Sequence, residues 1–321
     1  RHQPLTESSV KLNEVVVSAL SASRRIAGVQ IGAEQLHISE LTSVPALMGE
    51  HDIMRSVQLL PGVKAESEGS SGFQVRGGTA SQNLLLFDDT PVYNVSHLAG
   101  LFSAFNEDAL GSATLYKGQI PAQLGGASSA VLDMRGRTGD RKKWNGNIGI
   151  GLLSAKAAVE VPIASDKASL LVTARRSYMD AFLKLSPDYR DNTLFFYDVN
   201  AKADWTLNRH NRLELTLFGC RDKTALKDMV SITWQNKAAR LGWSCSIERL
   251  TAQTSLYHSE YETNNGFDLL GLNITYSGHI RHTGLSHNTH LTPTRWLQLD
   301  LGLQSTLLDV KSAEWTNVNK H

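Results

Sequence analysis

The second half of the chain alternates apolar and polar residues over unusually long stretches. From Val199 to Leu207 the odd positions are apolar and the even positions are polar. The same period of two recurs in residues 212–217, 239–248 and 297–304. Successive side chains of a strand point to opposite faces of a sheet, so each stretch has one apolar and one polar face. We count about nine such strands from residue 144 onward, which predicts a large antiparallel sheet.

The connections between these strands favour a membrane barrel over a soluble sandwich. Short joints at residues 164–167 and 208–211 alternate with longer ones at 177–194 and 221–232. Short turns at one end and long loops at the other are typical of outer-membrane barrels, whose strands need roughly 9–11 residues to cross the bilayer. A soluble β-sandwich, which could be an enzyme, is the alternative, but its strands are usually shorter and its turns more closely spaced.

Composition and motifs exclude several other classes of protein. The 32 Lys and Arg residues nearly balance the 31 Asp and Glu residues, which gives no support to a nucleic-acid binder. Two cysteines, Cys220 and Cys245, allow one disulfide at most. Residues 72–79 have the glycine spacing of a phosphate loop, but Gly78 stands where the lysine is required. We expect no catalytic residues, no metal site and no cofactor, and the chain lacks a run of 18 apolar residues for a membrane helix.

Residues 36–140 have the pattern of a compact α+β unit. Apolar spacing from Ile38 to Leu60 predicts one or two short helices that end at Pro61-Gly62. Short β-like pieces follow, separated by glycine-rich turns, at residues 73–76, 83–88, 113–117 and 130–134. Before this unit, residues 12–19 predict an extended segment. It is either an ordinary first strand or a strand that adds to the edge of another protein.

Several charged residues of the chain allow two interpretations. Arg76 and Arg135 each end a β-like piece next to a glycine. They are either solvated or, if buried, paired with polar-face residues of the sheet such as Glu160, Asp204 and Glu214.

Acidic pairs and histidines in the chain favour surface positions. For Asp88-Asp89 we expect a turn or a surface position. Histidines 279 and 287 fall on one face of a strand and histidines 282 and 290 on the other, so they predict solvated side chains better than a metal site.

Three ordered motifs resemble the plug domain of TonB-dependent outer-membrane receptors. Residues 70–78, Ser-Ser-Gly-Phe-Gln-Val-Arg-Gly-Gly, resemble its Arg-Gly motif. Residues 84–93 are similar to its apolar-Asp-Gly-x-Pro segment, with Asp89 in place of the usual glycine. Residues 116–134 match its closing stretch in order, with Leu124 where tyrosine is commoner. Residues 47–63 look like the first helices of the plug in Bacteroidetes members.

The resemblance implies a fold and assigns residues to it. It implies an α+β plug domain over residues 36–140, followed by an antiparallel transmembrane β-barrel that is incomplete here. Residues 141–321 would supply about nine of roughly 22 strands, and we expect the others beyond His321. Residues 12–19 would be either a strand after an N-terminal extension or a TonB-box-like element. The residues that match plug motifs are Arg76, Gly77, Gly78, Asp88, Pro91, Lys117, Gly118, Gly125, Gly126 and Arg135.

The resemblance also implies a function in the cell outer membrane. It implies active import of a large scarce nutrient, a ferric siderophore or a similar chelate, driven by the TonB complex of the inner membrane. The alternatives are a glycan or peptide importer that works with a surface lipoprotein, and a non-transporting adhesin or signal transducer. Outer-membrane lipid would surround the barrel, and no nucleic acid is expected as a partner. The candidate ligand-binding residues are Tyr93, Asn94, His97, Phe102, Tyr178 and Tyr189.

The barrel prediction is tested by fractionating native cells. An antibody against the peptide of residues 106–118 should detect a band in the outer membrane that is much heavier than this chain. Its mobility should change on boiling, because a folded barrel migrates differently from its unfolded chain. A soluble band of the size of this chain would contradict the barrel and support the sandwich.

Overall fold

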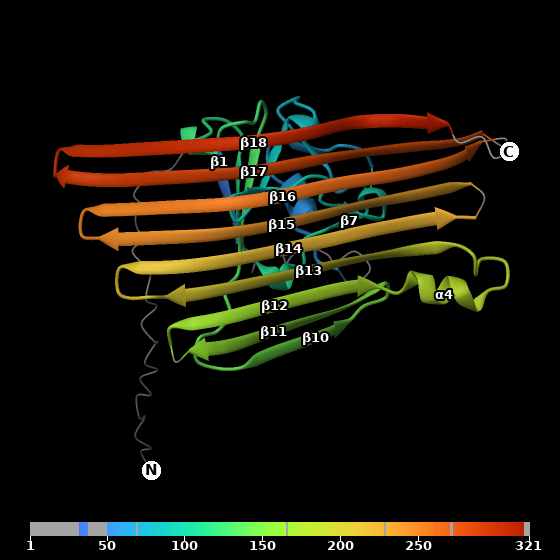
Figure 1. Cartoon of the computed structure of the whole chain (residues 1–321), viewed down its shortest axis with the longest axis horizontal. Helices are drawn as coiled ribbons and strands as arrows, with labels where there is room; N and C mark the ends of the chain where they lie inside the picture. Colours follow the sequence, from blue (N-terminus) through green and yellow to red (C-terminus); the bar gives the residue numbers. More distant parts are fainter. Residues whose placement is uncertain are drawn as a thin grey trace, which may run out of the picture.

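The computed structural model contains a large sheet and a compact unit that lies against one face of that sheet (Figure 1). We call strands β10 to β18 the long-strand sheet and the described residues up to 140 the compact unit. The predicted strand at residues 12–19 and the predicted helical segment at 38–49 lie outside the described residues. The structure describes residues 32–37, 50–68, 70–164, 166–227, 229–269 and 272–317.

The elements follow the chain in two groups. The long-strand sheet consists of β10 (Asn145–Ile150), β11 (Ser154–Ala164), β12 (Ala168–Ser177), β13 (Thr193–Thr206), β14 (Asn211–Leu226), β15 (Val230–Ile247), β16 (Leu250–Leu269), β17 (Leu272–Thr294) and β18 (Leu297–Asn317), with helix α4 (Met179–Leu185) between β12 and β13. The compact unit consists of β1 (Ala33–His37), α3 (Ile53–Gln58), β2 (Val63–Ala65), β3 (Phe73–Val75), β4 (Leu84–Phe87), β5 (Thr90–Pro91), β6 (Ser96–His97), β7 (Phe102–Ser103), β8 (Leu110–Tyr116) and β9 (Val131–Gly136), with short 3₁₀ turns between them.

The long-strand sheet is an antiparallel meander of nine described strands, as the alternating pattern predicts. Each strand pairs with the next one in the chain, and β13 to β18 are 14 to 23 residues long. On β13 the even-numbered Asp198 and Lys202 are buried against the compact unit, whereas Val199 and Trp205 between and beyond them are 42% and 52% exposed. The polar face of the sheet is therefore the covered face.

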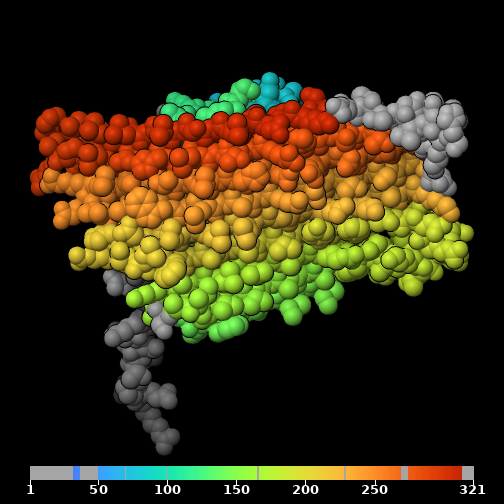
Figure 2. Space-filling model, viewed as in Figure 1, coloured from blue at the N-terminus to red at the C-terminus, as the bar shows by residue number. Residues whose placement is uncertain are grey.

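The opposite face of the long-strand sheet is uncovered and carries many apolar side chains. Figure 2 shows this face, with the compact unit visible only beyond its edge. Exposed apolar side chains gathered on one face mark a surface that contacts another apolar phase or partner. The exposed apolar side chains of the sheet include Val199, Trp205, Leu215, Leu217, Leu241, Trp243, Leu256, Leu285, Leu301 and Leu303. No helix in the described ranges is long and apolar enough to cross a bilayer.

The connections at the two ends of the sheet differ from the prediction at one point. The 177–194 connection carries helix α4, which lies at one end of the sheet (Figure 1). The long loop predicted at residues 221–232 is wrong, because β14 continues to Leu226 and β15 begins at Val230. The alternation is hidden there because Asp222 on the covered face is flanked by Arg221 and Lys223 on the other, so both faces are polar.

The compact unit contains a five-stranded sheet in the order β1-β8-β9-β4-β5. Strand β9 runs parallel to β4 and antiparallel to β8, so it holds the centre of the sheet. Strand β1 pairs with β8 and crosses the boundary predicted between residues 35 and 36. Helix α3 begins after Asp52, whose carboxylate accepts a hydrogen bond from Met54 N at 2.7 Å, and ends before the predicted Pro61-Gly62 stop.

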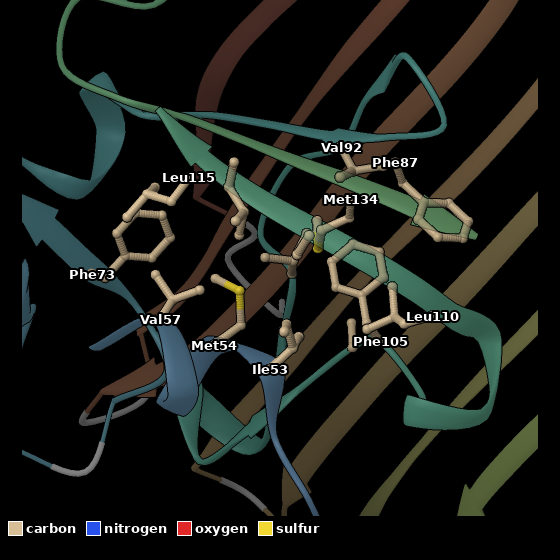
Figure 3. Packing of buried hydrophobic residues seen from close by; sticks show 14 of the residues in the cluster. Ile53, Met54, Val57, Phe73, Phe87, Val92, Phe105, Leu110, Leu115 and Met134 are labelled. Atoms are coloured by element: carbon tan, nitrogen blue, oxygen red, sulfur yellow. The ribbon is translucent and has the colours of Figure 1, made fainter. Parts of the chain in front are cut away.

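A hydrophobic core joins helix α3 to this sheet (Figure 3). Met54 and Val57 of the helix pack toward Phe73, Leu115 and Met134 of the strands, and all of them are nearly inaccessible to solvent. Each such side chain contributes roughly 1.5–3 kcal/mol by burial. The same cluster extends onto the long-strand sheet through Phe218, Trp234 and Ala238. Apolar packing thus fixes the internal shape of the compact unit and also reaches the sheet, there and at a second cluster of Leu98 and Phe102 with Phe196 of β13.

Truncation of a core leucine should destabilise the protein strongly. Leu115 is completely buried, so Leu115→Ala should lower the free energy of unfolding by about 2–5 kcal/mol. Urea unfolding of the protein in detergent micelles, followed by tryptophan fluorescence, measures this change. Leu59→Ala is the matched control, because Leu59 is 70% exposed and its loss should matter by less than about 0.5 kcal/mol. Equal effects of the two substitutions would contradict the core assignment.

Candidate functional site

The turn between β4 and β5 carries two aspartates toward the covered face of the long-strand sheet. Phe87 and Thr90 pair across it, and Asp88 and Asp89 have positive φ angles of 46° and 63°. A two-residue hairpin turn of this kind favours asparagine, aspartate or glycine, which explains why Asp89 is accepted where glycine is usual. The turn expected at Asp88-Asp89 is confirmed, but a surface position is wrong for Asp88, which is 1% exposed.

Asp88 forms a buried ion pair with Lys202 of β13. Lys202 Nζ lies 2.8 Å and 3.0 Å from the two carboxylate oxygens of Asp88 and also donates to the Gly136 carbonyl. The Thr216 hydroxyl and the Gly136 N–H donate to the same carboxylate at 2.8 Å and 3.1 Å. Every hydrogen-bonding direction of this pair is thus occupied, which a buried charge pair requires.

Asp89 extends the contact to two arginines. Its carboxylate lies 2.6 Å from Arg135 of β9 and 2.8 Å from Arg240 of β15. Arg240 also pairs with Glu214 at 3.1 Å, and Arg135 pairs with Asp133 at 2.8 Å. This chain of charges therefore joins the compact unit to strands β14 and β15.

The partners predicted for Arg76 and Arg135 are wrong. Arg135 contacts none of the three acidic residues of the long-strand sheet that the sequence suggested, because Asp89 and Asp133 of its own unit are closer. Arg76 is exposed in a turn with φ of 49°, which agrees with solvation. The three acidic residues have other partners: Glu160 pairs with Arg137, Asp204 with Arg141 and Arg212, and Glu214 with Arg240 and Arg212.

A second ionic cluster centres on Arg175 of β12. Its guanidinium lies 2.7 Å from Asp198 and 3.1 Å from Glu50 and donates to the Ser103 carbonyl at 2.6 Å. Arg175 is 3% exposed, so these three acceptors replace its hydration. Strands β12 and β13 are thereby joined to two segments of the compact unit.

Asp52 lies beside this cluster and joins helix α3 to β7. Its carboxylate accepts hydrogen bonds from Met54 N and Ser103 N. Burial raises the pKa of Asp52, although these donors and Arg175 favour the charged form. The Asp52 carboxyl therefore binds a proton more readily in the folded chain than in the unfolded chain. As pH rises from the pKa of the unfolded state to the higher pKa of the folded state, Asp52 lowers the free energy of unfolding.

His97 is held between two strands of the sheet and is fully buried. Its Nδ1 lies 3.2 Å from Asp222 and its Nε2 lies 3.5 Å from Asp198. Its ring stacks on Phe196 and on Trp234, with centroids 4.2 Å and 5.6 Å away. In this conformation His97, predicted as a ligand-binding residue, anchors the compact unit instead of facing solvent.

The other predicted ligand-binding residues lie in two places. The Tyr93 hydroxyl shares a hydrogen bond with His282 Nδ1 at 3.0 Å. The neighbouring Asn94 is exposed and has a positive φ angle of 42°. Phe102 is buried against Phe196. The other two belong to the α4 connection: the Tyr178 hydroxyl donates to the Gly151 carbonyl, and Tyr189 is 56% exposed.

The plug-motif residues outside the ionic clusters lie in turns and short strands of the compact unit. A Cβ atom on Gly118 would lie 2.9 Å from Arg76 Nη1, and Lys117 donates to the Pro61 carbonyl at 2.7 Å and pairs with Glu34. Gly77 and Gly126 have positive φ angles of 86° and 103°, and a Cβ atom on Gly78 would lie 2.3 Å from Ser129 Oγ. Gly125 follows a 3₁₀ turn, and Pro91 pairs with Leu86 across the β4–β5 hairpin.

Sequence reasoning missed several residues of this interface. Asp198, Asp222 and Arg175 are essential members of the clusters, and each lies on the covered face of a long strand. The signal that identifies them is a charge at the polar positions of the alternating pattern. Within the described ranges, no group of three or more histidine, cysteine or acidic side chains is arranged to hold a metal ion.

Solved structures share this architecture. The siderophore receptor PirA from Acinetobacter baumannii matches with a TM-score of 0.53 and 12% identity over 89% of this chain and 58% of its own. The copper transporter OprC matches with a TM-score of 0.65 and 11% identity over 88% of this chain and 47% of its own. The outer membrane transporter YddB from Escherichia coli matches with a TM-score of 0.53 and 11% identity over 88% and 55%.

These matches concern the fold. No protein-family model matches the sequence, and no curated protein matches it either. The chain spans about half the length of the solved structures to which it is similar. Over that part it has the fold of receptors and transporters of the outer membrane, which supports the resemblance seen in the motifs.

Breaking the buried pair should be far more costly than breaking an exposed one. Lys202→Met leaves Asp88 charged and unpaired, so it should lower the free energy of unfolding by about 3–5 kcal/mol. Adding Asp88→Asn to Lys202→Met should restore much of the loss, because the amide carries no charge. Urea unfolding in detergent micelles measures both effects.

The control for this experiment is an exposed pair on the same protein. Lys227 lies 2.7 Å from Asp191, both side chains are at least half exposed, and Lys227→Met should change stability little. If Lys202→Met were no more harmful than Lys227→Met, the buried pair would not be an anchor.

Proposed function

We propose that this chain is the plug domain and the first part of the barrel of a TonB-dependent importer in the outer membrane, of the Bacteroidetes-like type suggested by residues 47–63. Residues 36–140 form the plug and residues 141–321 the N-terminal barrel strands. The observation that carries the proposal is the two-faced sheet: its polar face holds the compact unit through ion pairs, and its other face exposes many apolar side chains. The fold similarity to outer-membrane transporters supports it.

The exposed face has the chemistry of a lipid-facing barrel wall. On β13, β14 and β15, exposed leucine, valine and tryptophan side chains alternate with covered polar residues such as Lys202, Thr216 and Arg240. In water this face would cost free energy in proportion to its area, and in a bilayer it costs none. The partner of this face is therefore outer-membrane lipid.

The covered face suits a plug that must move. An apolar interface would lose its burial free energy without replacement when the plug is displaced. Carboxylate, lysine and arginine groups exchange their partners for water instead, so a hydrated lumen lowers the cost of separation. Mechanical force from the TonB complex of the inner membrane, coupled to residues near the N-terminus, would then open a path for the substrate.

The substrate proposed from the sequence is a large scarce nutrient such as a ferric siderophore or a similar chelate. A siderophore receptor and a copper transporter are among the similar structures, which is compatible with chelate import. The alternatives are import of a glycan or peptide with a surface lipoprotein, and adhesion or signalling without transport. Of the candidate contact residues, Asn94 and Tyr189 are exposed in this conformation, whereas His97 and Phe102 would contact ligand only after the plug moves.

Energy-dependent uptake tests the proposed function in the native organism. Deletion of the gene should abolish high-affinity uptake of one labelled nutrient from a panel of iron chelates, oligosaccharides and peptides. Deletion of the TonB gene, or a protonophore, should abolish the same uptake, because transport needs the proton gradient. Surface binding that persists while no uptake depends on the gene would overturn transport and favour adhesion or signalling.

A further inference from the structure

On the uncovered face of the long-strand sheet, strand β14 changes from apolar to cationic along its length. Phe218 and Asp222 are buried on the covered face, so the odd-numbered residues of β14 lie on the uncovered one. Those residues are, in order, Leu213, Leu215, Leu217, Gly219, Arg221 and Lys223. An amphiphile with an apolar tail and an anionic head has the matching order of groups.

Aromatic side chains of the same face place the two cations at one edge of the apolar band of the proposed barrel. Trp205 of β13 and Trp243 of β15 pair with the same residue of β14, so they lie at one level. The stretch from Tyr197 to Trp205 is nine residues long, and Tyr197 pairs with Arg221. A tilted strand crosses a bilayer in roughly 9–11 residues, and aromatic residues mark both interfaces. Arg221 therefore lies at the level of lipid headgroups, with Lys223 just beyond it.

Other charged side chains near this level of the uncovered face have partners within the protein. Arg281 of β17 lies 2.8 Å from Glu260, and Lys237 of β15 lies 3.8 Å from the same side chain. Arg176 of β12 lies 2.8 Å from Asp180 of helix α4. The protein thus neutralises the charges on either side of β14 by itself.

Arg221 and Lys223 differ, because neither has an acidic partner in the part of the chain that the structure describes. The carboxylate in the row of Arg221 is that of Glu262, which accepts from Gln235 on the strand between them. Both cations are partly exposed, and neighbouring positions on one face of a strand lie about 7 Å apart. Two positive charges at this separation repel each other, so an anion bound between them stabilises both.

We propose that Arg221 and Lys223 bind the phosphate group of a membrane lipid. A guanidinium group holds phosphate through two parallel N–H donors, and an ammonium group adds a compact positive charge. Tyr197 is 37% exposed beside Arg221, so its hydroxyl is available as a third donor. This inference rests on the membrane-barrel part of the proposed function and not on transport.

The surface beside the two cations selects a lipid over free phosphate. Leu215 and Leu217 are 41% and 43% exposed on the same face of the same strand, where acyl chains of a lipid would cover them. The α4 connection lies at the cationic end of the strands, because it leads into β13 at Thr193, which pairs with Ala225 (Figure 1). Long connections lie at the outer end of a barrel, so the lipid belongs to the outer leaflet.

Lipid binding to the purified full-length protein in neutral detergent tests the inference. Native mass spectrometry should show saturable binding of lipid A with two phosphate groups. Dephosphorylated lipid A, which keeps the acyl chains, should bind at least tenfold more weakly. Arg221→Gln should weaken binding of the phosphorylated lipid about fivefold, and the double variant with Lys223→Gln should weaken it more than tenfold.

The matched control is Arg281→Gln. Arg281 lies on the same face and is about half exposed, but it is paired with Glu260, so its loss should leave lipid binding unchanged. Each variant should keep the change of gel mobility on boiling, which shows that its barrel is folded. A loss with Arg281→Gln as large as that with Arg221→Gln would overturn the location.

Two further outcomes would overturn the ligand. Equal binding of the two forms of lipid A would show that acyl chains alone are recognised. Full competition by millimolar inorganic phosphate would show a site for the free anion and not for a lipid.

Failure of this inference and failure of the proposed function are distinguishable. If phosphorylated lipid binds as expected but no TonB-dependent uptake depends on the gene, the lipid site stands and the transport function falls. If uptake depends on the gene while the phosphate groups make no difference to lipid binding, transport stands and the lipid site falls.

Discussion

Charges on the covered face of the long-strand sheet cannot be buried without partners, and this constraint organises the molecule. Lys202, Arg175 and Arg240 project from three different strands, and each meets a carboxylate of the compact unit. Because a buried unpaired charge is very costly, the unit has few positions in which all three are satisfied at once. The ion pairs thus specify where the compact unit lies, even where their net contribution to stability is small.

The same interface differs in kind from the interior of the compact unit. Inside the unit, Met54, Phe73 and Leu115 pack as an apolar core whose loss would unfold it. Between the unit and the sheet, buried ion pairs and hydrogen bonds lie beside apolar contacts of Phe196, Phe218 and Trp234. A separate core inside the unit is compatible with the proposed importer, whose plug would move as a body without first losing its own fold.

Local pattern made much of this structure predictable. The nine strands, the helix before Pro61-Gly62 and the turn at Asp88-Asp89 follow from period-two alternation and from the preferences of proline, glycine and aspartate, which act over a few residues. The strand ends at residues 221–232 were not predictable in this way, since both faces are polar there and alternation disappears.

The sequence by itself determined that the long segments after residue 144 are strands and, where alternation holds, which face of each strand is polar, because neighbouring side chains in an extended chain must point to opposite sides. Only the tertiary structure decided which charges pair. Asp89 and Arg135 are 46 residues apart in the chain, and Asp88 and Lys202 are separated by 114. Such partners are chosen by the register of the sheets and by the exclusion of water, and neither is written in any short stretch of sequence.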